Sequence, residues 1–282
     1  MSTNINENDN KNTGVYKTIK KNGTLSYRVS ITYLRKHISL GSYDNPDTAA
    51  KVYLDGRNIL DNTDISVESY NDSFSIPYQK FIILINFRDN GLYLPTPIYM
   101  RKKYFEYFLS ENEILKFDRD DLFFYSSHKI QKKGGYLFVS DYGSQYSILS
   151  RYGIKPFSVY ARDYIMINND KNDYRYDNIK IINHYMGVTV REGVSGSMYQ
   201  AAIHINGNYV IGYYESEIIA AIAYNKAADI LHANGFKKQY IKNYIISLDK
   251  SEYERLYRAI TISDKITGYH ASSSSNIPLS SS

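Results

Sequence analysis

The side chains with the most evident capacity for chemistry in this 282-residue chain gather in one short stretch. They are Asn168, Asp170, Asp173, Arg175 and Asn178. The side chain that most often transfers protons at neutral pH is the imidazole of histidine. The stretch holds no histidine, and the nearest candidates, His128 and His184, lie outside it. The same composition readily produces turns, so a polar turn between two strands is the alternative interpretation.

No other constellation in the sequence predicts catalysis. Asp118 and Asp120-Asp121 have no evident catalytic partner, and the latter pair favours a helix cap or a turn. Gly134-Gly135 stands alone, so it does not make a glycine-rich phosphate loop. The absence of cysteine excludes disulfides and thiolate zinc sites. The sequence therefore predicts no metal, no cofactor and no catalytic residue, which favours a binding protein over an enzyme.

A stronger signal is a pattern that is written twice, at residues 14–60 and 187–231. Each copy has a glycine-valine start, a tyrosine, a second glycine and a second tyrosine at matching places. The matched pairs are Gly14 and Gly187, Tyr27 and Tyr199, Gly41 and Gly212, and Tyr53 and Tyr224. A short unit that recurs once at this distance indicates a module present in two copies rather than a solenoid.

Each copy predicts three strands followed by a helix. Apolar residues alternate with mostly polar ones at a period of two, as they do in half-buried strands. These residues are Val15, then Tyr27, Val29 and Ile31, then Ile38 and Leu40 in the first copy, and Val188 and Val190, then Tyr199, Ala201 and Ile203, then Tyr209 and Ile211 in the second. Asn22-Gly23 favours a tight hairpin, and Asn45-Pro46 favours a helix start. We expect helices over about 46–60 and 217–233.

This order of residues resembles the ethylene-response-factor (AP2/ERF) DNA-binding domain. The matching positions are Gly14-Val15, Tyr27, Ile31, Leu40-Gly41-Ser42-Tyr43, Ala49-Ala50 and Tyr53 in the first copy, and Gly187-Val188, Tyr199, Ile203, Ile211-Gly212-Tyr213-Tyr214, Ala220-Ala221 and Tyr224 in the second. The resemblance implies that a three-stranded sheet enters the major groove of duplex DNA while the helix packs behind it. That groove is wide enough to admit a β-ribbon.

Alternation with the apolar positions picks out the residues that would face DNA. They are Tyr16, Thr18, Lys20, Arg28, Ser30, Thr32, His37 and Ser39 in the first copy, and Thr189, Arg191, Gln200, His204 and Asn208, with Ala202 and Val210, in the second. The family usually fills such positions with arginine and tryptophan, whereas this chain has no tryptophan. The resemblance therefore supports the fold, and double-stranded DNA as partner, better than any base preference. Ordinary solvated sheet faces are the alternative interpretation.

Charge separates the two copies. Residues 13–60 hold eight Lys and Arg against three Asp, a balance of +5, whereas 187–235 hold two basic against four acidic residues, a balance of −2. Because attraction to phosphate dominates affinity for nucleic acid, we expect the first copy to anchor the DNA. The second is expected to bind weakly, to borrow charge from Lys237, Lys238 and Lys242, or to contact protein instead.

The region between the copies is similar to the HNH endonuclease domains that are often fused to AP2 modules. The matching residues are Asp173, Arg175 and Asn178, which resemble the family signature DNRxxN, with Asn168 and Asp170 just upstream. The family places one histidine where this chain has Met166 and another near 147–151, where the chain has none. Methionine and serine cannot replace imidazole as a base, and a thioether is a poor ligand for Mg²⁺. The resemblance therefore implies a degenerate nuclease fold.

The predicted fold class is α+β, with two small modules of a three-stranded antiparallel sheet plus a helix around a central α+β HNH-like domain. The expected divisions are a disordered tail at 1–12, modules at 13–62 and 185–235, the central domain at 75–183, a helical segment at 236–268 and a serine-rich disordered tail at 269–282. No apolar run is long enough to span a membrane, and the N-terminus carries no signal peptide. We expect an intracellular protein, in the nucleus or cytoplasm of a host cell if it is viral.

The leading hypothesis from the sequence is a DNA-binding regulator of transcription. A net charge of +5 fits nucleic-acid binding, and 31 tyrosines with abundant Asn, Lys and Ile indicate AT-rich coding, as in a virus or mobile element. The alternatives are an HNH homing endonuclease with AP2 modules and a structural nucleic-acid-binding protein without sequence preference. Cleavage with divalent metal distinguishes the first alternative, and binding to random duplex distinguishes the second.

Overall fold

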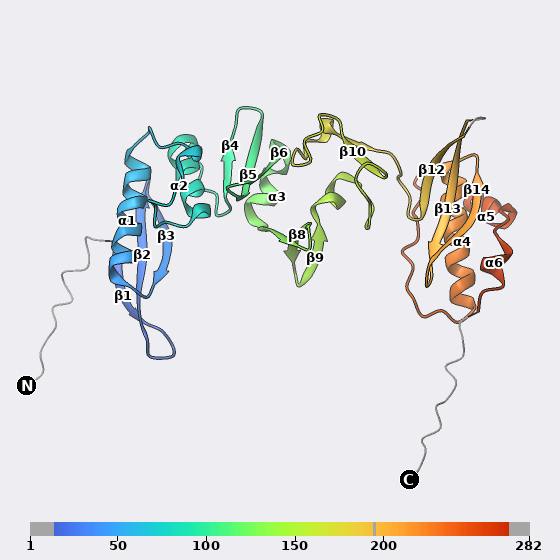
Figure 1. Cartoon of the computed structure of the whole chain (residues 1–282), viewed down its shortest axis with the longest axis horizontal. Helices are drawn as coiled ribbons and strands as arrows, with labels where there is room; N and C mark the ends of the chain where they lie inside the picture. The colour runs from blue at the N-terminus through green and yellow to red at the C-terminus, as the bar shows by residue number, and fades with distance from the viewer. Residues whose placement is uncertain (1–13, 194–195, 271–282) are drawn as a thin grey trace, which may run out of the picture. The chain divides into compact units, whose positions relative to one another are not determined.

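A computed structural model describes residues 14–193 and 196–270, so the predicted tail at 1–12 and residues 271–282 of the predicted tail at 269–282 lie outside the described residues. The chain divides into two compact units, of which the first comprises residues 1–148 and 170–178 and the second comprises 149–169 and 179–282. The described residues form five small antiparallel sheets and six α-helices (Figure 1). The predicted α+β fold class is confirmed. The division between the units runs through the predicted central domain at 75–183.

The first module has the predicted three strands and one helix. Strands β1 (Val15–Ile19), β2 (Leu25–Tyr33) and β3 (Lys36–Tyr43) form an antiparallel sheet in that order, and helix α1 (Pro46–Asp61) follows. The buried core between the sheet and the helix includes Val29, Ile31, Ile38, Leu40, Ala49, Val52 and Ile59. The side-chain oxygen of Asn45 accepts hydrogen bonds from the backbone nitrogens of Asp47 at 2.7 Å and Thr48 at 3.2 Å, which begins the helix as predicted.

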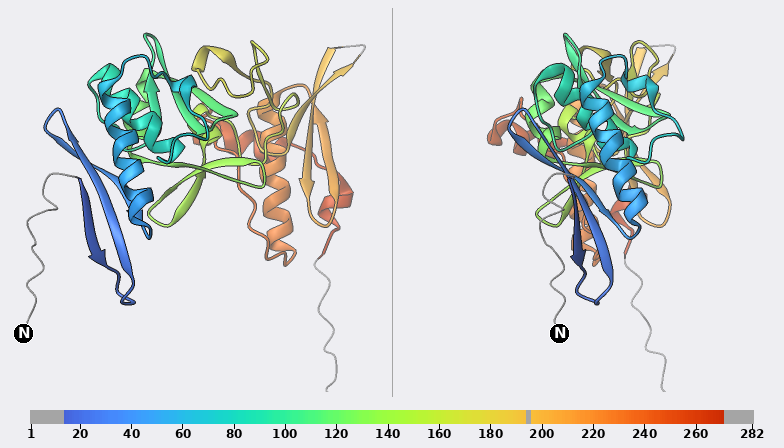
Figure 2. Two further views of the ribbon diagram at one scale, coloured as in Figure 1. Left: turned by 60° about the vertical axis from the view of Figure 1, so that its left-hand side comes forward. Right: turned by 90° about the vertical axis from the view of Figure 1, so that its left-hand side faces the viewer.

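The second module repeats this arrangement. Strands β12 (Val188–Gly193), β13 (Gly196–His204) and β14 (Asn208–Tyr214) form an antiparallel sheet in that order, followed by helix α4 (Glu217–Ala233). The buried core includes Val188, Ala201, Ile203, Ile211, Ala220, Tyr224, Ala227 and Leu231. In each module the helix covers one face of its sheet (Figure 2).

A glycine and a tyrosine make the same close approach in both modules. Gly14 and Gly187 adopt positive φ angles of 65° and 70°. A β-carbon added to Gly14 would lie 2.2 Å from the ring of Tyr53, and one added to Gly187 would lie 2.2 Å from the ring of Tyr224. In both modules the glycine carbonyl also accepts a 2.8 Å hydrogen bond from the central strand. Only glycine permits this geometry, which explains why the glycine–tyrosine pairs recur.

A β-bulge also recurs at the same place in both sheets. The register of β2 and β3 jumps at Leu40, which has no partner of its own on β2. The register of β13 and β14 jumps in the same way at Ile211. Both residues are buried against the helix. In the first part of β3 and β14, every second side chain points away from the helix. The bulge shifts this alternation by one residue in the rest of each strand.

The rest of the first unit is built on the first module. It contains α2 (Tyr78–Asn90), a sheet of β4 (Ile98–Met100), β5 (Tyr104–Ser110) and β6 (Glu113–Asp118), α3 (Leu122–Ser127), and a sheet of β7 (Ile130–Lys133), β8 (Tyr136–Asp141) and β9 (Ser144–Ser147). Phe81, Leu84 and Phe87 of α2 belong to the core of the first module. Helix α2 therefore completes the core of the first module.

The rest of the second unit surrounds the second module. Strands β10 (Tyr164–Met166) and β11 (Ile179–Ile181) pair antiparallel, and α5 (Lys250–Ala259) and α6 (Asp264–Thr267) follow α4. The segment predicted to be helical at 236–268 has no helix before Lys250. Asn225 of α4 explains this, because its side chain exchanges hydrogen bonds of 2.9 and 2.7 Å with the backbone of Asn243. Tyr269, predicted to lie in the tail, packs its ring 5.3 Å from that of Tyr209.

Candidate nucleic-acid interface

The face of the first sheet turned away from α1 carries rows of polar side chains, because residues paired across strands point to the same side. Tyr16 of β1 faces Arg28 of β2, which faces Ser42 of β3. The other rows pair Thr18 with Ser26, Ser30 with Ser39, and Thr32 with His37. We call this surface the first outer face. The strand register thus brings together Tyr16, Thr18, Arg28, Ser30, Thr32, His37 and Ser39, as the sequence predicted.

Arg28 holds the centre of the first outer face. Its side chain is exposed, and it makes no hydrogen bond or ion pair with any other residue that the structure describes. Tyr16 beside it is 37% exposed. By contrast, Lys20 at the end of the sheet is paired with Asp44 at 2.5 Å. The guanidinium of Arg28 is therefore available to a phosphate or to a base edge.

Ser30 contributes less to the first outer face than the alternation predicted. Its side chain lies on the outward side of the central strand but is only 4% exposed. The reason is its position, since Ser39 flanks it on one side and Gly14, which accepts its backbone N–H at 2.8 Å, on the other. Its short hydroxyl group is thus enclosed by the neighbouring strands.

The structure adds one outward residue in each module that simple alternation missed. Counting every second residue along β3 from His37 and Ser39 leads to Gly41, but the bulge at Leu40 turns Ser42 outward instead. The equivalent residue of β14 is Tyr213, which faces Gln200 and is 56% exposed. A bulge adds a residue without changing the apolar pattern around it, so only the repeat of an aliphatic residue followed by Gly-x-Tyr in both copies could have indicated it.

On the corresponding face of the second sheet, several polar side chains hydrogen-bond to their neighbours. We call this face the second outer face, and it carries Thr189, Arg191, Gln200, Ala202, His204, Asn208 and Val210, as predicted, together with Tyr213. The Arg191 guanidinium donates to the side-chain oxygen of Gln200 at 2.8 Å, and the Gln200 amide donates to the Tyr213 hydroxyl at 3.3 Å. The His204 ring nitrogen lies 3.0 Å from the Asn208 side-chain oxygen.

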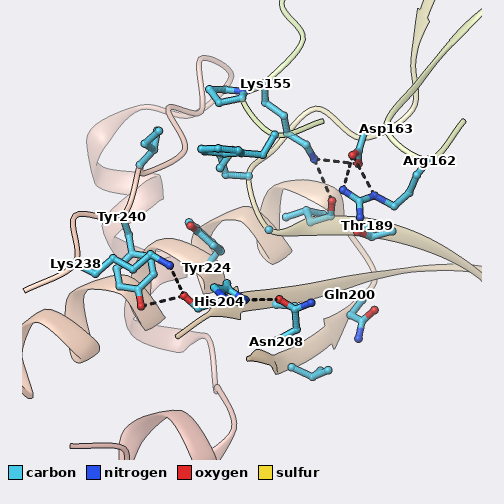
Figure 3. A pocket seen from close by; sticks show the side chains of 18 of the residues that line it. Lys155, Arg162, Asp163, Thr189, Gln200, His204, Asn208, Tyr224, Lys238 and Tyr240 are labelled. Atoms are coloured by element: carbon cyan, nitrogen blue, oxygen red, sulfur yellow. Dashed lines mark hydrogen bonds and ion pairs between the residues drawn. The ribbon is translucent and has the colours of Figure 1, made fainter. Parts of the chain in front are cut away.

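The second outer face is the floor of a cleft of about 730 Å³. Residues from 155–163 and from 238–241 complete its lining. Figure 3 shows Lys155, Arg162 and Asp163 gathered near Thr189, while Lys238 and Tyr240 lie beside His204. The Lys238 ammonium donates to the His204 carbonyl at 2.7 Å. Of the lysines expected to lend charge to this module, Lys238 lies in the lining of the cleft, whereas Lys242 is paired with Asp229 on α4.

Asp163 fastens one wall of the cleft to the second module. Its carboxylate is 1% exposed and accepts hydrogen bonds from Arg162 at 2.6 Å and from the backbone of Val159 at 2.8 Å. Burial alone would raise the pKa of Asp163, but these donors hold it below its usual value. The Lys155 ammonium lies 3.5 Å from the same carboxylate, and burial lowers its pKa. Asn183 joins the wall to the sheet, because it donates to Asp163 and accepts from the backbone of Val190.

The residues that resemble the HNH signature form a tight turn in the first unit. The carboxylate of Asp173 is buried and receives two hydrogen bonds from Arg175, at 2.8 and 2.5 Å. The Asn178 amide donates to the Asp173 carbonyl at 2.8 Å. Asp170 pairs with Lys116 of β6 at 2.8 Å, and the turn docks on that strand through two backbone hydrogen bonds. Asn168 belongs to the second unit, just after β10.

The two histidines nearest to this turn in the sequence each have partners of their own. The ring of His128 stacks on Phe124 at 4.3 Å, and its Nδ1 lies 2.9 Å from the Phe124 carbonyl. The Nδ1 atom of His184 lies 3.1 Å from a carboxylate oxygen of Glu217. Within residues 14–193 and 196–270 there is no group of three or more His, Asp or Glu side chains placed to hold a metal ion.

Comparisons with known proteins give no further guide to the site. No protein-family model matches the chain, and neither a curated protein nor a solved structure matches it. Among the helices that the structure describes, none is both long and apolar enough to cross a membrane.

Proposed function

We propose that this protein binds duplex DNA through the first outer face and acts inside a cell as a regulator of transcription. The observation that carries the proposal is the row of Tyr16, Arg28 and Ser42, with a guanidinium that no described residue engages. Arginine at the centre of an exposed sheet can grip a guanine edge or a phosphate. Serine and tyrosine hydroxyls on either side can bond phosphates and fix the register.

The dimensions of the first sheet suit the major groove. Three strands about 4.8 Å apart span about 10 Å between the outer two, and the major groove of B-DNA is about 12 Å wide. The helix lies on the opposite side, so it does not obstruct entry. Lys21 lies in the β1–β2 hairpin and Arg35 in the β2–β3 hairpin, where they can reach the phosphates that border the groove.

The acidic groups of the first module do not oppose this electrostatic attraction at the sheet centre. Asp55 accepts hydrogen bonds from the backbone nitrogens of Ser75 and Ile76, and Asp61 pairs with Arg57 on the helix at 3.2 Å. Both are residues of α1, on the side of the module away from the first outer face. The exposed charge at the centre of the first outer face is therefore the guanidinium of Arg28.

Arg28→Ala is the variant that tests the proposal, with Arg57→Ala as its matched control. Both changes remove one arginine from the same module, but Arg57 lies on the helix. We expect Arg28→Ala to weaken binding to a labelled duplex by about tenfold or more, since a good base contact contributes about 1–3 kcal/mol. Arg57→Ala should change the affinity by no more than about twofold. Equal losses in fluorescence anisotropy titrations would remove the first outer face as the binding surface.

Supercoiled plasmid separates a regulator from a nuclease. We expect the protein to bind the plasmid and leave it intact with Mg²⁺ or Mn²⁺, because the Asp173 carboxylate is held by Arg175 and the turn lacks an imidazole. If nicks do form, Asp170→Ala identifies their origin, since Asp170 lies at the surface of the turn. Loss of nicking in that variant, with duplex binding retained, would replace the regulator by an endonuclease.

A further inference from the structure

The cleft over the second outer face is basic, although the module that forms its floor is acidic. Four cations line it, namely Lys155, Arg162, Arg191 and Lys238, against the single carboxylate of Asp163. Three of the four lie outside the strands and helix of the second module. Arg162 is 54% exposed on its side chain, so one face of its guanidinium is open beyond its pair with Asp163. The walls therefore supply a positive charge that suits an anionic ligand.

Large apolar side chains stand exposed on the same walls. Phe157 lines the cleft and is 83% exposed, and Ile241 on the other wall is 53% exposed. Phe157 also has a φ angle of 63°, a left-handed conformation that is rare for a bulky residue. An exposed ring held in a strained backbone conformation is typical of a contact site. Tyr240 adds a second aromatic ring to the lining.

The floor of the cleft carries side chains that can read the edges of bases. Gln200 and Asn208 present amide groups, and Thr189 presents a hydroxyl group. An amide both donates and accepts hydrogen bonds, as the edges of nucleobases do. In the free protein the Gln200 amide bonds to Arg191 and Tyr213, and the Asn208 amide oxygen lies beside His204, so a ligand would exchange those bonds for its own.

We propose that this cleft binds single-stranded nucleic acid. A strand of unpaired nucleotides combines flat bases, which stack on Phe157 and Tyr240, with phosphates, which the cations of the walls attract. Duplex DNA does not fit this site, because its bases are already stacked and a sheet must project freely to enter the major groove. Here the sheet is recessed between residues 155–163 and 238–241. An acidic peptide would match the charge but would leave the aromatic rings and amide groups without equivalent partners.

The test uses the full chain and fluorescence anisotropy with a labelled mixed-sequence DNA strand of about 12 nucleotides, within the usual range of such sites. Phe157→Ala should weaken binding of this strand by about tenfold, the order expected when one stacked base is lost. Lys238→Gln should weaken it less, because glutamine can still donate to the His204 carbonyl but lacks the charge. Phe123→Ala is the matched control, since Phe123 is 90% exposed in the first unit. It should leave the affinity unchanged.

The outcomes distinguish this site from the proposed duplex-binding face. The inference stands if Phe157→Ala weakens binding of the single strand alone, whether or not the duplex binds. It fails if the single strand does not bind, or if it binds with an affinity that Phe157→Ala and Lys238→Gln leave unchanged. It also fails if a labelled poly-glutamate peptide binds and the single strand does not, which would assign the cleft to acidic protein segments. Loss of duplex binding in Arg28→Ala bears only on the first outer face.

Discussion

The two modules share their packing but differ in their outer faces. Gly14 with Tyr53 and Gly187 with Tyr224 make the same close approach, and the bulge falls at the equivalent residue in both sheets. On the outer side the modules differ, because Arg28 is exposed and uncommitted whereas Arg191 donates to Gln200. The side that packs against the helix tolerates little change, since substitutions there create clashes or cavities. The outer side is free of that constraint, so one scaffold can present two different surfaces.

The surroundings of the two modules also differ. The first module is completed by α2, which adds apolar side chains to its core. The second module is enclosed on its outer side by residues 155–163 and 238–241. A projecting sheet suits a duplex groove, and a recessed one suits a ligand that enters a cleft. The neighbours of a module therefore determine what its outer face can bind.

Substitution of the paired glycines tests the claim of common packing and should have the largest effect. Gly14→Ala and Gly187→Ala each place a β-carbon 2.2 Å from a tyrosine ring in a left-handed conformation. We expect each to lower the free energy of unfolding of its unit by about 2–5 kcal/mol, measured in urea. Gly23→Ala is the control, because Gly23 has a φ of 82° but no neighbour within 4 Å of an added β-carbon. It should cost about 1 kcal/mol. A small loss of stability at only one of the paired glycines would show that the two modules do not share this packing.

Removal of the anchors of the two helices should have an intermediate effect. The Arg88 guanidinium donates to the carbonyls of Ile59, Asn62 and Ile65 at the end of α1, at 2.6–2.7 Å. Asn225 holds α4 to the segment at Asn243. We expect Arg88→Ala to destabilise the first unit by about 2–3 kcal/mol and Asn225→Ala to destabilise the second by about 1–3 kcal/mol. Each should leave the other unit unchanged in thermal unfolding, and a loss in both units would show that they do not fold separately.

Substitution in the β2–β3 turn should have the smallest effect on stability, and it should raise the free energy of unfolding rather than lower it. Leu34 and Arg35 have positive φ angles of 44° and 64°, which favour glycine and asparagine. Replacement of the pair by Asn-Gly should stabilise the first unit by about 1 kcal/mol. Leu34→Ala, which keeps a side chain in the left-handed conformation, serves as control and should give no gain. An unchanged unfolding midpoint in the Asn-Gly variant would show that the turn carries no strain.

The sequence predicted the elements of each module closely but not their surroundings. Period-two alternation and the Asn45-Pro46 start placed the strands and α1, because these signals are local. The bulges were missed, since an extra residue such as Leu40 is apolar and fits the pattern. The role of α2 and the walls around the second sheet were missed for another reason. They depend on contacts between segments far apart in the chain, such as Asp163 with Asn183, which no local pattern reports.

The central claim is that the first module, and not the second, holds duplex DNA. Hydrogen–deuterium exchange of the full chain, with and without a saturating mixed-sequence duplex, tests it most directly. We predict slower exchange in residues 15–43, with little change in 188–214. A single strand of the same sequence should produce the reverse pattern. Protection by duplex that is confined to 188–214, or that is equal in both modules, would contradict the account.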